Sequence, residues 1–264
     1  MRIVSLASGS SGNAILVDSG ATRILVDCGI GPRILKTRLA TVGVRPDQIS
    51  AVIVTHEHLD HVRGIPFALA RWPWTVIGSA GTVRRLPRKA RSAAAAMQRS
   101  HSVGDFDIEA IPVSHDASEP TAFIVTDRAT GRRAGIAHDL GQASDSLISA
   151  FRGVDLLCIE ANHDIEMLRR GPYSPWLKDR VASATGHLSN DQTAAFIDAV
   201  STRELRAVLL LHLSQVNNTP AIACATAKRG ISHRAKRASV AAAARKAMSP
   251  AIGERHSGQL ALAI

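Results

Sequence analysis

Short apolar runs alternate with Gly-containing turns along the first part of the chain. The runs RIVSLAS (2–8), AILVDSG (14–20), TRILVDCG (22–29) and AVIVTHEH (51–58) predict strands. Later apolar runs predict five more strands, at 108–116, 122–127, 132–139, 155–162 and 207–214. Together with the intervening helical segments, this order of elements indicates an α/β protein.

Two segments carry clear helical signals. Residues 31–44 have apolar positions at helical spacing. Residues 188–201 begin with a capping pattern in which Ser189 caps the helix and Gln192 completes a capping box. Ala195, Phe196 and Val200 are expected on the inner face of this second helix.

The pattern loosens from about residue 229, where Ala, Arg and Lys dominate and Pro250 and Gly253 interrupt. The basic, Ala-rich segment 229–250 is compatible with a surface helix or with a partly mobile stretch. The final run GQLALAI (258–264) predicts a last strand. The length of 264 residues fits one α/β domain that spans 1–264.

Composition narrows the class of protein. Hydrophobic residues make up 45 %, as in globular proteins, and no apolar run approaches the roughly 18 residues that span a bilayer. The start of the chain lacks the features of a signal peptide, so we expect a cytoplasmic protein without membrane contact. The three cysteines Cys28, Cys158 and Cys224 show no CxxC spacing and are expected to be reduced, with Cys28 a weak candidate for metal binding.

The formal net charge of +10 is unevenly distributed. Residues 84–99 and 228–246 contain many bases and no acid. These runs are explained equally well by solvated helix faces and by neutralisation of the phosphates of a polyanion. The aromatic content of 3 % argues against an extended platform for stacking single-stranded bases.

Polar residues recur at the C-terminal ends of the predicted strands. Five side chains occupy such positions: His56, His115, Asp139, Glu160 and His212. Polar residues at successive strand ends converge on one edge of a sheet, where an active site can be built. We therefore expect these side chains to lie together.

The stretch VTHEHLDHVRG (54–64) holds three histidines and two acids within eight positions. His56 and His58 flank one residue of extended chain, so both side chains point the same way and can hold one ion. Asp60 and His61 follow after the chain turns and can face a second ion. Imidazole and carboxylate donors fit Zn²⁺, with Mn²⁺ also plausible.

The motif THEHLDH resembles the signature of the metallo-β-lactamase fold, an αββα four-layer sandwich of two mixed β-sheets. Four further residues match later motifs of that family: Asp27 in ILVDCG, His115 in PVSHDA, Asp139 in GIAHDLG and His212 in LLLHLS. The resemblance implies that His56, His58 and His115 hold a first metal. It also implies that Asp60, His61 and His212 hold a second, that Asp139 bridges the two, and that Asp27 supports the histidine loop from behind.

Further segments resemble a narrower group, the YycJ-like (WalJ-like) bacterial proteins. They are SLASGSSGNAILV, EANHDIEML, GPYSPWLKDRV, GHLSNDQTA and HLSQVNNTP. That group is associated with 5′→3′ exonuclease activity on DNA, which implies a nucleic-acid substrate and a repair role. Two departures are Leu59 within the histidine motif and the basic, Ala-rich end of the chain.

The expected chemistry is hydrolysis of a phosphodiester by hydroxide that two metal ions hold between them. Asp60 can orient this nucleophile as well as bind metal. His187 is the candidate for the acid that protonates the leaving oxygen, because imidazole titrates near neutral pH. The competing interpretation is that His187 only forms a hydrogen bond near the helix cap.

Other residues receive supporting roles. Glu160 and His163 are expected to support the ligand histidines. The loop SGSSGN (8–13) either cradles a phosphate, with Ser10, Ser11 and Asn13 as contacts, or is only a tight turn. Lys178 and Arg180, with Tyr173, are candidates for lining the substrate groove, whereas Trp176 is expected in the core. No role is assigned to His101, His138, His233 or His256.

Two other functions remain open. One is hydrolysis of a thioester, lactone or other small ester on the same scaffold, since a fold does not fix its substrate. The other is a nucleic-acid-binding protein with an inactive centre. The basic charge and His187 favour a nuclease, and the complete set of candidate ligands favours an enzyme. Substrate preference, cleavage polarity, native metal and oligomeric state are not determined by the sequence.

Overall fold

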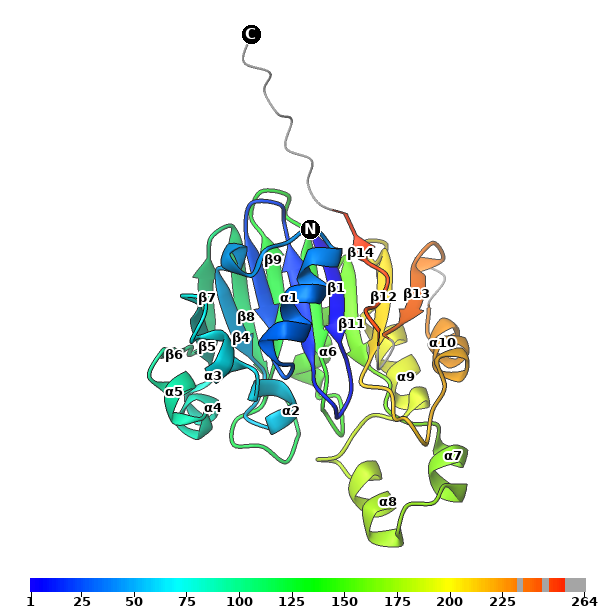
Figure 1. The fold of residues 1–264 in the computed structure, drawn as a ribbon. Helices are drawn as coiled ribbons and strands as arrows, with labels where there is room; N and C mark the ends of the chain where they lie inside the picture. Colours follow the sequence, from blue (N-terminus) through cyan, green and yellow to red (C-terminus); the bar gives the residue numbers. More distant parts are fainter. Residues whose placement is uncertain (232–234, 244–246, 255–264) are drawn as a thin grey trace.

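The computed structural model of the protein describes residues 1–231, 235–243 and 247–254. Two seven-stranded sheets lie face to face, and helices cover their outer faces (Figure 1). This is the αββα four-layer sandwich of two mixed sheets that the sequence motifs implied.

The first sheet has the strand order β14-β1-β2-β3-β4-β5-β6. Strands β1 to β3 form an antiparallel meander, and β3 to β6 run parallel. The strands are β1 Arg2–Ala7, β2 Ala14–Asp18, β3 Arg23–Val26, β4 Ala51–Val54, β5 Thr75–Gly78, β6 Ala94–Ala96 and β14 Ile252–Gly253. The helical segments that connect them are α1 Pro32–Thr41, η1 Pro46–Gln48, α2 Leu59–Val62, α3 Ile65–Ala68, α4 Ala80–Arg85 and α5 Arg88–Arg91.

The second sheet has the order β13-β12-β11-β10-β9-β8-β7. Its strands are β7 Ser100–Val103, β8 Phe106–Pro112, β9 Thr121–Asp127, β10 Arg133–Ala137, β11 Leu156–Glu160, β12 Ala207–Leu211 and β13 Ser239–Ala242. The strands from β10 to β13 are parallel, so their C-terminal ends meet at one edge. The associated helices are α6 Asp145–Phe151, α7 Ile165–Arg170, α8 Pro175–Ala182, α9 Asn190–Val200 and α10 Pro220–Arg229. Helices α7 and α8 project away from the sandwich (Figure 1).

The strands bury apolar side chains on both faces, which explains why their sequences are continuously apolar. In β2, Ile15 and Val17 enter the core between the sheets, whereas Leu16 packs in the cluster beneath the helices of the first sheet. Phe106 and Phe123 fill the same inter-sheet core from the second sheet. This burial fixes the strand register, because a shift by one residue would exchange the two faces.

The two helices predicted from the sequence are present. The segment 31–44 contains α1, and 188–201 contains α9 with the capping box between Ser189 and Gln192. Phe196 and Val200 are buried as expected. The expectation for Ala195 is wrong: it is exposed, and Ile197 takes its place in the core.

Within the segment 229–250, residues 239–242 form β13, an edge strand that pairs in parallel with β12, so this part is not the expected surface helix. Residues 232–234 and 244–246 lie outside the described residues. The small side chains of β13 gave no strand signal, and its pairing with β12 determines its conformation. Strand β14, which pairs with β1, was also unpredicted, whereas the strand expected at 258–264 lies outside the described residues.

The cysteines are free thiols, as expected. Burial raises the pKa of Cys28 to about 12, and Cys28 belongs to none of the metal-competent clusters among the described residues. A thiolate ligand at this position is therefore disfavoured. Within the described part of the chain, no helix is long and apolar enough to cross a membrane.

Candidate metal centre

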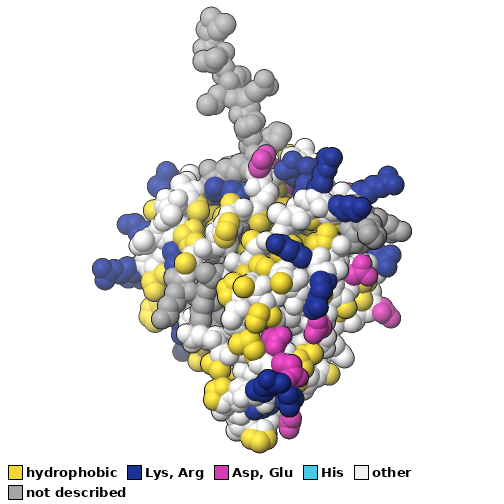
Figure 2. Space-filling model, turned by 90° about the vertical axis from the view of Figure 1, so that its right-hand side faces the viewer, with side chains coloured by type: hydrophobic (Ala, Val, Ile, Leu, Met, Phe, Trp, Pro, Cys, Tyr) yellow, Lys and Arg dark blue, Asp and Glu magenta, His cyan; other side chains and the backbone are white. Residues whose placement is uncertain are grey.

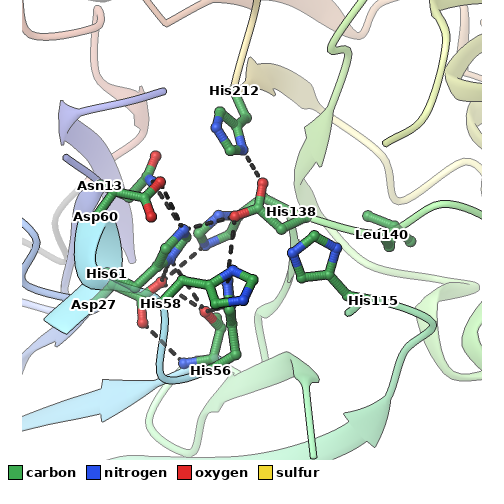
Figure 3. Close-up of polar contacts among 12 residues, drawn as sticks. Asn13, Asp27, His56, His58, Asp60, His61, His115, His138, Leu140 and His212 are labelled. Carbon is green, nitrogen blue, oxygen red and sulfur yellow. Dashed lines mark hydrogen bonds and ion pairs between the residues drawn. The ribbon is translucent and has the colours of Figure 1, made fainter. Parts of the chain in front are cut away.

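The histidine motif follows β4 at the edge where the parallel strands of the first sheet end. Strand β4 is fully buried and apolar, and the chain turns after it into the short helix α2. His58 precedes this helix with extended backbone, and its Nδ1 lies 3.1 Å from His56 Nε2. His61, within α2, is completely buried. The turn thus gathers three imidazoles from six consecutive residues (Figure 3).

One cluster consists of His56, His58 and His115, whose donor atoms lie within 4.8 Å of one another. His115 comes from the loop after β8, so the second sheet contributes its third member (Figure 3). Burial, together with the charge of His187, lowers the pKa of His115 to about 4. His115 is therefore neutral at pH 7, as a metal ligand must be. This trio is the set implied for the first metal.

Asp139 lies between the histidines of the two sheets. Its Oδ2 is 2.6 Å from His61 Nε2 and 3.6 Å from His56 Nε2, and its Oδ1 contacts His212 Nδ1. Asp139 consequently belongs to two clusters, one with His56 and His61 and one with Glu160, His187 and His212. Such a shared position is the one implied for a bridging carboxylate.

Asp60 and His212 complete the set implied for the second metal. Asp60 Oδ2 lies 3.4 Å from His61 Nε2, but Asp60 is not a member of the tight donor clusters. Burial would raise the pKa of Asp60, yet the hydrogen bond and charge of His61 lower it to about 2. Burial, with the charges of His61 and His138, lowers the pKa of His212 to about 3.

Asp27 supports the motif from behind, with two bonds to Thr55 and two contacts with histidines. Its Oδ1 accepts from the Thr55 backbone N–H and its Oδ2 from the Thr55 hydroxyl, both at 2.8 Å. Oδ2 also accepts from His61 Nδ1 at 2.8 Å. Burial would lower the pKa of His61, but Asp27 and Asp60 raise it to about 9. Asp27 therefore fixes the ring so that its Nε2 faces Asp139.

His138 is a member of this support that the sequence did not reveal. Its Nε2 lies 3.2 Å from Asp27 Oδ2, and its ring stacks on that of His61 at 5.0 Å. Its place directly before Asp139, at the end of β10, was the available signal. Of the other histidines without an assigned role, His101 lies on β7, while His233 and His256 lie outside the described residues.

Three residues of the centre share an unusual backbone conformation. Asp27, Asp139 and His212 have φ angles of 61°, 57° and 51°, and they are the only non-glycine residues of the described chain with positive φ. Residues other than glycine adopt this region at a cost of roughly 1–3 kcal/mol and do so mainly at functional sites. The surrounding fold holds all three at the strand ends.

The buried acids of the centre indicate that it needs positive charge from a cation. Asp27, Asp139 and Glu160 are almost completely buried, and their ion-pair partners among the described residues are histidines rather than Lys or Arg. Buried carboxylates require compensating charge. The raised pKa values of His61 and His187 allow these two rings to offset part of the charge, whereas the pKa values of His56 and His212 are lowered. Divalent ions would supply the remaining compensation, and the donor set fits them.

Glu160 and His187 form a pair beside the candidate ligands. His187 Nδ1 donates to Glu160 Oε1 at 2.7 Å, and Glu160 Oε2 accepts from the backbone N–H of Leu140 at 3.0 Å. Burial would lower the pKa of His187, but the charge and hydrogen bond of Glu160 raise it above its ordinary value. His163 lies apart from these clusters: it is buried, and its carbonyl oxygen accepts from Asn190 N–H at the start of α9.

The loop 8–13 packs against the histidine motif. Asn13 is buried, with its Oδ1 accepting from Gly9 N–H and its Nδ2 lying 3.2 Å from Asp60 Oδ2. Its amide therefore holds the loop in place and is not available to a substrate. A side chain on Gly29 would collide with the Asp60 carbonyl oxygen, and one on Gly64 with the Ile30 carbonyl oxygen, so both close approaches require glycine.

The candidate ligands open into a pocket of ≈ 490 Å³. Residues around its mouth include Ser10, Tyr173 and Arg180, whereas Ser11 is exposed outside it. Arg180 donates to Asp116 at 2.6 Å, and Lys178 donates to the Arg169 carbonyl oxygen, away from the pocket.

Helix α8 lines part of the pocket and contains a clear departure from expectation. Trp176, expected in the core, is 69 % exposed, with the Arg180 guanidinium 5.9 Å from its ring centre. Helix α8 buries no side chain completely, because it projects from the sandwich. Figure 2 shows hydrophobic atoms beside charged side chains at the tip of this projection, and scattered Lys and Arg side chains on the face above it.

The fold and the histidine–carboxylate centre define a class of protein that comparison with known proteins confirms. Residues 22–213 match the family model described as the β-lactamase superfamily domain, so the chain belongs to this superfamily and is a metal-dependent hydrolase. It is 31 % identical to the exodeoxyribonuclease WalJ of Streptococcus pneumoniae, over 83 % of each chain. It is also 31 % identical to the exodeoxyribonuclease YycJ of Bacillus anthracis, over 83 % of this chain and 84 % of that protein. The metallo-β-lactamase fold protein YhfI of Bacillus subtilis shares the fold, with a TM-score of 0.71, 21 % identity, and coverage of 95 % of this chain and 98 % of that one.

Proposed function

We propose that this protein is a dinuclear metal-dependent phosphodiesterase that degrades DNA from an end, as a 5′→3′ exonuclease with a role in repair. The convergence of donors from both sheets on Asp139 carries this proposal. The 31 % identity to two exodeoxyribonucleases supports the choice of DNA. We further propose that 1–264 acts as one domain in the cytoplasm.

His56, His58 and His115 would hold one ion, and Asp60, His61 and His212 a second, with Asp139 shared between them. Zn²⁺ suits these imidazole and carboxylate donors best, and Mn²⁺ is the alternative. When bound, the ions would supply a nucleophile derived from water and neutralise charge on the phosphate. Asp60, at the pocket wall, would orient that water.

His187 is the proposed proton donor to the leaving oxygen. It lines the pocket, and Glu160 holds its Nδ1, so Nε2 is the atom left for the substrate. Glu160 acts through His187 and is a positioning residue. The DNA strand would enter the pocket past Ser10, Tyr173 and Arg180. Of these residues, Arg180 would contact a phosphate.

The decisive experiment offers the protein end-labelled duplex DNA, single-stranded DNA, RNA and a thioester, each with Zn²⁺ or Mn²⁺, and resolves the products by length. Stepwise shortening of DNA from its 5′ end is expected. Hydrolysis of the thioester alone would replace the proposal with small-ester hydrolysis. Binding of nucleic acid without hydrolysis, despite two bound metals, would indicate an inactive centre.

A further inference from the structure

A second concave surface lies on the outer side of the first sheet, away from the metal centre. It is a groove of ≈ 740 Å³ between α1, η1, α3 and the chain that follows α3. We call it the α1–α3 groove and define it by its lining residues: Pro32, Arg33, Lys36, Arg45, Pro46, Asp47, Phe67, Arg71 and Trp72. The residues assigned to hydrolysis are all outside it.

The charge of the α1–α3 groove is strongly positive. Four of its side chains are cationic and one is acidic, and the acid, Asp47, already pairs with Arg45 at 3.0 Å. Arg33 and Lys36 are exposed, and neither forms an ion pair with the described residues. Cations that face solvent one helical turn apart, without acidic partners, suit a polyanion.

Aromatic rings give the groove a second property. Phe67 is 60 % exposed, which is unusual for such a large apolar side chain. Trp72 stacks on Trp74 at 5.1 Å, and Trp74 Nε1 donates to the Pro46 carbonyl oxygen at 2.8 Å, so the ring of Trp72 is held firmly. The chain has only nine aromatic residues, and two of them line this groove. Flat rings beside cations are the elements that bind single-stranded nucleic acid.

A row of side chains connects the groove to the metal centre. Leu59, Arg63, Phe67 and Arg71 are exposed and recur every fourth residue through α2, α3 and the turns around them. Arg63 N–H and Ala68 N–H form helical hydrogen bonds, whereas Gly64 N–H between the two short helices donates to the Cys28 carbonyl oxygen. The row begins beside Asp60 and His61, the proposed metal ligands, and ends in the groove.

We propose that the α1–α3 groove is a second binding site, for a single-stranded polynucleotide that continues along this row from the metal centre. Phosphates contact Arg33, Lys36 and Arg71, and bases stack on Phe67 and Trp72. The link to the metal centre rests on the proposed nuclease function, whereas binding in the groove does not. A nucleic-acid strand bound both in the groove and at the metal centre would stay aligned with that centre between successive hydrolysis steps.

The test measures binding of fluorescent 20-nucleotide dT and rU strands to the full chain by anisotropy, in EDTA, at several salt concentrations. Phe67→Ala is expected to weaken binding by about 5- to 100-fold, the usual effect of losing one base stack. Arg33→Ala/Lys36→Ala is expected to lower the slope of log affinity against log salt by about 1.4, the contribution of two phosphate contacts to a single strand. A six-nucleotide strand, too short to fill both places, should bind the wild type more weakly than the 20-nucleotide strand.

Matched controls lie among the helices and turns that connect the strands of the second sheet. Arg152→Ala/Arg203→Ala removes two exposed cations beyond the far end of the second sheet, and Ile222→Ala trims an exposed side chain on α10. Both should bind as the wild type does. Thermal unfolding within about 2 °C of the wild type would show that each variant folds.

Each outcome separates the groove from the nuclease proposal. If the groove variants bind like the wild type, or lose no more than the controls, the groove is not a binding site. Wild-type protein that binds through the groove but hydrolyses no nucleic acid would remove the nuclease function alone. Unchanged binding in the groove variants, with DNA hydrolysis retained, would remove the groove alone.

Discussion

The two sheets contribute to the metal centre in different ways. The first sheet supplies His56, His58, Asp60 and His61 from one turn after β4. The second sheet supplies His115, Asp139, Glu160, His187 and His212 from five separate places along the chain. Local chain geometry assembles the first half, whereas strand order assembles the second.

The halves also differ in what surrounds them. The first half is held from behind by Asp27 and His138, which contact His61. In the second half, Glu160 holds a histidine that faces the pocket. Under the proposed function, the first half would give each ion two firmly held ligands, and the second half would give each ion a further ligand and add the proton donor.

Asp139→Ala should have the largest effect, because this residue contacts histidines of both halves. Metal content measured by mass spectrometry is expected to fall at both sites, and hydrolysis by at least about 10³-fold, since bound metal supplies several kcal/mol. His58→Ala, the comparison variant, should lose chiefly the ion proposed for His56, His58 and His115, together with activity. Two ions retained in Asp139→Ala would contradict a shared ligand.

His187→Ala tests the second half alone. The expected loss of kcat is about 10²- to 10⁴-fold, the usual contribution of a general acid, with metal content unchanged. Glu160→Gln should cause a smaller loss and alter the pH profile, because the amide cannot raise the pKa of His187 as the carboxylate does. Loss of metal from His187→Ala, or full turnover, would show that His187 has another role.

Asp27→Asn tests the support of the first half. Removing a carboxylate behind a ligand histidine weakens metal binding by about 10- to 100-fold, and we expect that range in a chelator titration. His138→Ala should weaken it less, since Asp27 still bonds to Thr55 and His61. Equal affinity in Asp27→Asn and wild type would mean that the motif needs no such support.

The smallest effect is expected on the first-sheet side, outside the centre. Arg84, Arg85, Arg88 and Lys89 are exposed on α4 and α5. Replacing all four with Ala should leave turnover of a small phosphodiester nearly unchanged, while it weakens duplex DNA binding and lowers the slope of log affinity against log salt by up to about 3.6. An unchanged salt slope, measured beside Arg152→Ala/Arg203→Ala, would remove this surface from the binding path.

The sequence predicted much of this arrangement because its strands are buried on both faces and end in polar residues. His56, His58, His115 and Asp139 were expected together, and they lie together. Edge strands β13 and β14 escaped prediction because small or few residues form them and pairing alone defines them.

Contacts that depend on tertiary packing were harder to predict. His138 resembles an ordinary histidine until β10 is placed beside Asp27. Trp176 is of a residue type that is usually buried, but it lies exposed on a projecting helix. The neighbouring sequence does not indicate that this helix projects. The α1–α3 groove is formed by residues from three segments between Pro32 and Trp72 that only packing brings together. The low aromatic content of the whole chain therefore gave no sign that two aromatic rings lie side by side with cations there.

Gly29 and Gly64 carry no chemistry, yet each leaves just enough room for a carbonyl oxygen of the neighbouring loop. If every residue were substituted and each variant scored by activity, these two glycines would tolerate substitution as poorly as the metal ligands do, and even alanine would inactivate the protein. Inactivating variants found there would say nothing about substrate contact. They would show that the turn after β3 and the turn after β4 must pack in close contact for the centre to bind a metal ion.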